Sequence, residues 1–168
     1  MPAFKARAIS LKTKPFAEAD KMVTLFSLEH GKIRVLAKSA RRVPSSLGGK
    51  VETLSYGEYL IIKGRSIDIV SQCEVLETFD SVRCNPATLM IGLYFLKLID
   101  AGTSEGQNNP ELFDLLLKGL TALKQGKDPR TVELRFEKAF MRREGIFRDG
   151  VEPKYCLSEH LGVDLTKW

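Results

Sequence analysis

Three segments in the second half of the chain begin with Asn-Pro or Asp-Pro and end at a glycine. They run over residues 85–102, 109–126 and 128–145. Asn or Asp at the N-cap, Pro at the first helical position and Gly just past the last turn are the residues that helix ends favour. This punctuation constrains the fold more than any other feature, because it predicts three consecutive helices.

The interiors of these segments have helical spacing. The first is apolar nearly all round, which predicts the central helix of a small bundle. Each of the other two carries one apolar stripe, made of Leu112, Leu115, Leu116 and Leu123 in one segment and Val132, Phe136, Ala139 and Phe140 in the other. After them we expect one helical turn over 158–161 and a Trp168 that is tucked onto the bundle.

The first half of the chain has strand patterns instead. Apolar residues alternate with polar ones over 4–12, and a turn is expected over 13–20. A second strand is expected over 22–28, where residues on both faces are apolar, and a third from residue 31. A fourth is expected over 51–62, with a bulge at Gly57, and a fifth over 67–79. Five antiparallel strands with a long connection between the third and fourth predict an OB-like barrel, although an SH3-like barrel has the same strand count.

The change of pattern near residue 80 predicts an α+β protein with two segregated parts. We expect a five-stranded OB-like β-barrel, an OB-fold domain, at 1–80. A small helical domain at 81–168 would contain three main helices and a short C-terminal tail.

The stretch 30–50 carries six cations and no carboxylate: Lys32, Arg34, Lys38, Arg41, Arg42 and Lys50. In its first half Ile33 and Val35 alternate with the cations, so a half-buried strand would hold its positive charges on the wet face. A loop with a Pro-Ser-Ser-x-Gly-Gly tail follows. Cations arranged in this way suit a nucleic-acid backbone, since each one that neutralises a phosphate releases condensed counterions.

The distribution of charge supports a polyanionic partner for the first half. Residues 1–79 hold 13 Lys and Arg against 8 Asp and Glu, whereas residues 80–168 hold 13 of each, so the first half carries the whole net charge of +5. Bases also stack on aromatic rings in such grooves. Tyr56, Tyr59 and Phe16 are candidates, although for each ring ordinary packing is the simpler interpretation.

The sequence offers little for catalysis. It contains no glycine-rich phosphate loop, the acidic residues are scattered, and His30 and His160 lack metal-ligand spacing. The cysteines Cys73, Cys84 and Cys156 are far apart, and sparse thiols of odd number fit a reducing compartment. We therefore expect no catalytic residue, no metal and no cofactor. The N-terminus has no apolar signal core, so we expect a cytoplasmic protein.

Several separated motifs resemble one family in the right order. They are EADKMVTLFSLEHGKIRVLAKSARR, LGGKVETLSYGEYLI and CEVLETF, then NPELFDLLLKGLTAL and LRFEKAFMRREG. Together they resemble the bacterial recombination mediator RecO, over roughly residues 4–147. The resemblance implies an N-terminal OB-fold and a helical domain.

The resemblance also implies a function in DNA repair and recombination. Members of this family bind single- and double-stranded DNA and anneal complementary strands. With RecR they help to load RecA onto DNA covered by single-strand binding protein, whose C-terminal tail they bind through the helical domain, and they need no nucleotide. By position, Lys32, Arg34, Lys38, Arg41 and Arg42 would contact DNA, and Lys50 extends the same basic stretch. Arg135, in Leu-Arg-Phe-Glu, is a candidate for the tail-binding pocket.

The chain departs from the family pattern after residue 155. Many members continue into further helices and a four-cysteine zinc element. Cys156 stands about where the first of those cysteines would be, but Glu159 occupies the position three later, and the chain ends at Trp168. We therefore expect a short member without the zinc element, whose helices could complete their core as a homo-oligomer. Two other functions stay open, an RNA-binding or ribosome-associated OB protein and a protein-docking adaptor whose basic face holds an acidic peptide.

Overall fold

The computed structural model describes residues 2–168 and divides them into two compact units. The first unit contains the chain up to residue 78 together with residues 103–113. The second contains residues 79–102 and 114–168. The segment between the first two long helices therefore belongs to the strand-rich unit, although the sequence around it is helical.

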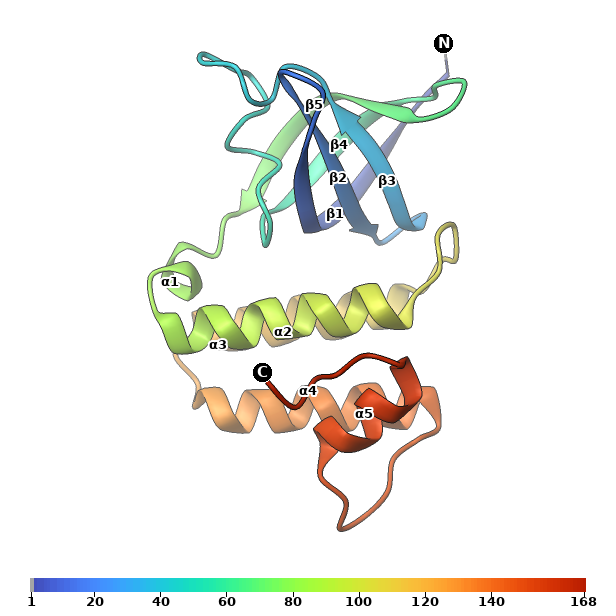
Figure 1. Cartoon of the computed structure of the whole chain (residues 1–168). Coiled ribbons are helices and arrows are strands. Elements are labelled where there is room, and N and C mark those ends of the chain that lie inside the picture. The colour runs from blue at the N-terminus through green and yellow to red at the C-terminus, as the bar shows by residue number, and fades with distance from the viewer. Residues whose placement is uncertain (1) are drawn as a thin grey trace. The chain divides into compact units, whose positions relative to one another are not determined.

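Five strands form the first unit (Figure 1). They are β1 (Ala3–Phe16), β2 (Asp20–Ser27), β3 (Gly31–Ala37), β4 (Tyr56–Ile62) and β5 (Asp68–Glu77). They close into a barrel in the order β1-β2-β3-β5-β4, with β3 and β5 parallel and every other pair antiparallel. This non-sequential order confirms the predicted OB-like barrel, but the expectation that all five strands pair antiparallel is wrong for β3 and β5.

The barrel core follows the predicted strand patterns. All residues of β2 from Val23 to Ser27 are buried, as its two apolar parities predict. On β3, Val35 and Ala37 are buried while Arg34 is exposed. The predicted bulge is present, since the β4–β5 register shifts between Tyr56 and Gly57. A Cβ at Gly57 would lie 2.7 Å from the Glu74 carbonyl oxygen, which explains the glycine.

Two strand boundaries differ from the prediction. The turn expected from residue 13 is wrong, because β1 continues to Phe16 and pairs with β2 as far as Asp20. The pairing of β1 with β4 ends at Ile9. Pro15, which has no N–H, therefore removes no hydrogen bond to β4. The fourth strand begins at Tyr56 instead of residue 51. Leu54 has a φ of 78° there and donates its N–H to the Ser10 carbonyl at 2.9 Å.

The helices are α1 (Asp80–Arg83), α2 (Pro86–Gly102), α3 (Pro110–Lys124), α4 (Pro129–Glu144) and α5 (Pro153–Leu161). The three predicted long helices are confirmed, and so are their caps. The side chains of Asn85, Asn109 and Asp128 accept backbone hydrogen bonds at 2.9, 3.1 and 2.9 Å. Gly145 ends α4 in the left-handed conformation, with a φ of 71°.

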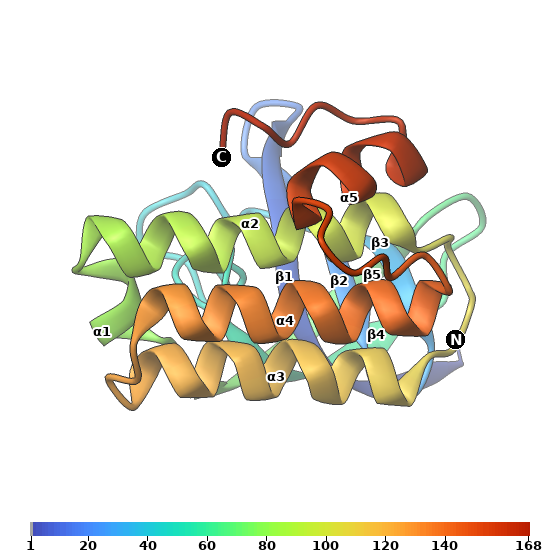
Figure 2. The same ribbon diagram turned by 90° about the horizontal axis from the view of Figure 1, so that it is seen from below.

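The core of the second unit is aromatic. Phe95 of α2 stacks on Phe136 of α4, with ring centroids 3.9 Å apart and an interplanar angle of 14°. Gly119 lets α3 approach both rings, because a Cβ there would lie 3.1 Å from each of them. Figure 2 shows α2, α4 and α3 running side by side.

The C-terminal segment is more helical than predicted. The expected single turn is part of the longer helix α5, which begins at Pro153. The Trp168 ring lies 6.1 Å from the Tyr94 ring, between centroids, so it packs onto the helical unit as predicted. Lys154 holds this end of the chain, since its Nζ donates to the Trp168 carbonyl at 2.6 Å and pairs with Glu133 at 3.1 Å.

A buried carboxyl group lies under this segment. The Tyr94 hydroxyl donates to Glu137 Oε2 at 2.7 Å, and Oε1 has no hydrogen-bond partner among residues 2–168. Burial raises the pKa of Glu137, and nearby Glu133 raises it further. The hydrogen bond from Tyr94 and the charges of Lys154 and Arg130 act in the opposite direction.

This carboxyl group predicts a pH-dependent stability. Because its pKa is raised in the folded protein, the folded state holds the proton more tightly than the unfolded chain does. Stability therefore falls as the pH rises from about 4.3, the unfolded value, through the raised folded pKa. Above this pH range we expect Glu137→Gln to have a larger free energy of unfolding than wild type. Below it, where Glu137 is protonated in wild type, the two free energies of unfolding should be equal.

Urea unfolding between about pH 4 and pH 8 measures this difference. The exposed Glu159 provides the control, because Glu159→Gln should leave the pH profile of wild type unchanged. A difference between Glu137→Gln and wild type that stays constant across the pH range would contradict the assignment.

Candidate nucleic-acid interface

The predicted basic residues lie on β3 and on the connection from β3 to β4, drawn in cyan in Figure 1. Arg34 is exposed on β3 and Lys32 is half-buried. Lys38, Arg41, Arg42 and Lys50 are exposed on the connection. The alternation expected on the strand is therefore clear at the exposed Arg34 and the buried Val35 and Ala37, whereas Lys32 and Ile33 are both half-buried.

Buried apolar residues anchor the connection to the barrel. Ala40, Leu47 and Val51 belong to the barrel core. The Ser45 hydroxyl accepts hydrogen bonds from the N–H groups of Leu47 and Gly48, at 3.2 and 3.1 Å. These buried residues alternate along the chain with the exposed cations. The backbone that carries the cations is therefore fixed to the barrel.

Arg41 ties the start of this connection to the β1–β2 turn. Its backbone N–H donates to the Ala19 carbonyl at 2.9 Å, and its Nη1 donates to the Ala17 carbonyl at 3.2 Å. The Ser39 N–H donates to the Asp20 carboxylate at 2.8 Å. Arg41 therefore has a structural contact in addition to its charge, which the sequence pattern did not indicate.

The basic residues differ in how freely they could meet a phosphate. Lys38, Arg42 and Lys50 form no ion pair with any other residue in the range 2–168. Arg34 instead pairs with Glu105, at 2.7 Å between Nε and Oε1. Glu105 is thus a neighbour of the site that sequence reasoning missed, because it comes from the connection between α2 and α3.

The three candidate stacking residues have different positions. Tyr59 is fully buried in the barrel core, and burial raises the pKa of its hydroxyl. Tyr56 is half-buried and packs on Phe113, with centroids 6.0 Å apart. Phe16 is 45% exposed and immediately precedes Ala17, the partner of Arg41. Of these three rings, only Phe16 has the exposure that a base would need.

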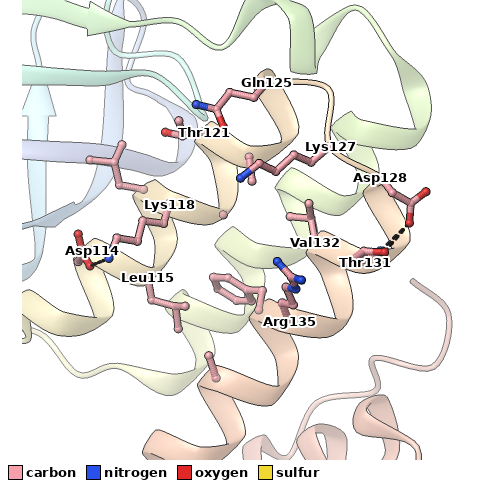
Figure 3. A pocket seen from close by; sticks show the side chains of 15 residues that line it. Asp114, Leu115, Lys118, Thr121, Gln125, Lys127, Asp128, Thr131, Val132 and Arg135 are labelled. Atoms are coloured by element: carbon pink, nitrogen blue, oxygen red, sulfur yellow. Dashed lines mark hydrogen bonds and ion pairs between the residues drawn. The ribbon is translucent and has the colours of Figure 1, made fainter.

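A second candidate site is a groove of about 920 Å³ between α3 and α4 (Figure 3). Its volume is in the range of ligand-binding clefts. Apolar groups of Leu115, Ala122, Val132, Phe136 and Ala139 line it, and Gly119 brings α3 into contact with the Phe136 ring, which is 2% exposed. Arg135, the residue predicted for a partner pocket, is exposed on α4 and lines this groove.

The groove has an excess of unpaired positive charge. Both of its carboxylates are engaged, because Asp114 pairs with Lys118 at 2.9 Å and Asp128 caps α4 through Thr131. Lys127 and Arg135 form no ion pair with the other described residues. An apolar floor beside free cations suits a peptide that combines apolar side chains with carboxylates.

No group of three or more His, Cys, Asp or Glu within residues 2–168 is placed to hold a metal ion. Cys156 is buried on α5 and, like Cys73 and Cys84, forms no disulfide. A search of the same residues finds no helix with the length and hydrophobicity needed to cross a bilayer.

Two models of known protein families match the chain, one in each half. The family model described as "Recombination protein O N terminal" matches residues 1–79, and the one described as "Recombination protein O C terminal" matches residues 83–149. The barrel, the basic connection and the α3–α4 groove all lie within these matches.

Among the similar proteins, three bear the description "DNA repair protein RecO". The Caldicellulosiruptor saccharolyticus protein is 34% identical over 96% of this chain and 66% of its own length. The Alkaliphilus metalliredigens protein is 34% identical over 84% of this chain and 58% of its own length. The Bacillus subtilis protein is 29% identical over 92% of this chain and 61% of its own length. The chain thus spans somewhat less than two thirds of these relatives. Because the two RecO family models together match most of the chain, it belongs to the RecO family of DNA repair proteins.

Proposed function

We propose that this chain binds single- and double-stranded DNA through β3 and the β3–β4 connection. The observation that carries the proposal is the set of free cations on the acid-free stretch. Lys38, Arg42 and Lys50 are exposed and have no ion-pair partner in the part of the chain that the structure describes. Phosphates can neutralise them without breaking an internal contact. Arg41, Lys32 and Arg34 extend the same surface.

Binding of this kind supports strand annealing. Two complementary strands repel each other through their phosphates, and a protein that neutralises phosphates lowers this repulsion. No nucleotide, metal or covalent step is needed, so we assign the chain as a non-enzymatic recombination mediator. By the family resemblance, it would act with RecR to load RecA onto DNA covered by single-strand binding protein. This function places it in the cytoplasm, at the nucleoid.

We assign the α3–α4 groove to the acidic and apolar C-terminal tail of single-strand binding protein. Arg135 and Lys127 would bind carboxylates of the tail, and the floor around Phe136 would take an apolar side chain. This arrangement separates the two partners, with DNA on the barrel unit and the protein tail on the helical unit.

An annealing assay tests the proposed activity. Two complementary oligonucleotides with donor and acceptor dyes are mixed with and without the protein at low salt. We expect the protein to raise the annealing rate about tenfold or more, since electrostatic assistance of association has this size. Protein that binds both strands without accelerating annealing would contradict the mediator function. Binding of an RNA oligomer in preference to DNA of equal length would favour the RNA-binding alternative.

A further inference from the structure

The connection between α2 and α3 lies along the start of β3. The Gly106 N–H donates to the Lys32 carbonyl at 2.9 Å, and Glu105 forms a parallel bridge with Lys32. Gly31 permits this approach, because it has a φ of 68° and a Cβ there would fall 1.9 Å from the Gln107 carbonyl oxygen. The connection is thus held on the basic strand by backbone contacts.

This position brings a carboxylate onto a predicted DNA-binding arginine. Glu105 Oε1 lies 2.7 Å from Arg34 Nε, and the two side chains are 53% and 59% exposed. A guanidinium binds carboxylate and phosphate by the same charge-assisted hydrogen bonds. Exposed pairs of this kind contribute little to stability and exchange readily with the solvent.

We propose that Glu105 occupies a phosphate subsite of Arg34 in the DNA-free protein, and that a backbone phosphate of DNA displaces it. This inference rests on the proposed DNA-binding function and adds a regulation to it. The carboxylate competes with DNA for one cation, so the need to break the Arg34–Glu105 ion pair lowers the affinity for DNA.

Displacement needs only the side chain to move. The backbone of residues 104–107 is held by the Gly106–Lys32 hydrogen bond and by one from the Gln107 N–H to the Ser104 carbonyl at 3.4 Å. None of these contacts involves the Glu105 carboxylate. Replacing the carboxylate by an amide therefore removes the competitor and leaves the connection in place.

Fluorescence anisotropy of a labelled oligothymidylate tests the proposal with Glu105→Gln. We expect this variant to bind about threefold more tightly than wild type at low salt, which is the size of an exposed ion pair. The slope of log affinity against log salt should change little, because a phosphate reaches Arg34 in both complexes.

Two controls separate this mechanism from a general effect of charge. Glu58→Gln makes the same charge change on β4, where the carboxylate pairs with Lys5 at 3.5 Å, and it should not change the affinity. In an Arg34→Gln background, Glu105→Gln should no longer improve binding, because the subsite is gone. A gain that persists without Arg34, or that Glu58→Gln reproduces, would overturn the proposal.

The result for wild type separates the Glu105 proposal from the proposed DNA-binding function. If wild type binds DNA and Glu105→Gln binds equally well, the subsite proposal fails and the DNA-binding function stands. If neither protein binds at low salt, both are wrong.

Discussion

Reversing two cations of the β3–β4 connection, Lys38→Glu together with Arg42→Glu, is expected to weaken binding of oligothymidylate about a hundredfold at about 50 mM salt. Each cation that neutralises a phosphate releases counterions, and a carboxylate in its place adds repulsion. Both side chains are exposed and free of ion pairs within the described range, so the barrel should fold unchanged. Anisotropy titrations measure the loss, and thermal unfolding checks the fold.

The matched control for this pair lies on the helical unit. Lys127→Glu with Lys138→Glu makes the same change in net charge at two exposed positions that are also free of ion pairs among the residues the structure describes. We expect it to change DNA affinity only slightly. Equal losses in the two double variants would show that net charge, and not the β3–β4 connection, determines binding.

The second large effect is expected at the groove. Arg135→Glu should weaken binding of a synthetic peptide with the acidic and apolar C-terminal sequence of single-strand binding protein by tenfold or more. Hydrogen bonds to charged groups contribute about 1.5–3 kcal/mol, and the new carboxylate would also repel the peptide. Isothermal titration calorimetry measures the peptide affinity directly, and DNA binding should be retained.

Lys138 again provides the comparison, because it is exposed on α4 and does not line the groove. Lys138→Glu should bind the peptide within about twofold of wild type, as expected for a screened surface charge. Peptide binding that survives Arg135→Glu would place the tail-binding site elsewhere.

Local sequence signals predicted most of the architecture. Helix caps are contacts between residues two or three apart, so Asn85, Asn109 and Asp128 could be recognised from the sequence alone. The alternation on β3 likewise identified which of its residues face the core. The length of β1 was missed, because Pro15 is tolerated only where the second neighbouring strand has ended, and strand pairing is not a local property.

For the candidate site, the sequence predicted which residues are basic but not which contacts they make. The sequence indicated the six basic residues, but it could not separate the free Lys38 and Arg42 from Arg41, which is tied to Ala17. The pairing of Arg34 with Glu105 was also invisible. The connection that carries Glu105 reads as a polar linker, and only the backbone approach at Gly31 reveals that it lies on β3.

The salt dependence of DNA binding by the wild-type chain tests the central claim most directly. We predict tight binding of oligothymidylate at low salt, with log affinity falling linearly with log salt. The three free cations, Lys38, Arg42 and Lys50, together with Arg34 once Glu105 is displaced, predict a slope of about −2 to −3, at about −0.7 for each phosphate that is neutralised on a single strand. No binding at low salt, or an affinity that does not change with salt, would contradict the claim that these cations bind the DNA backbone.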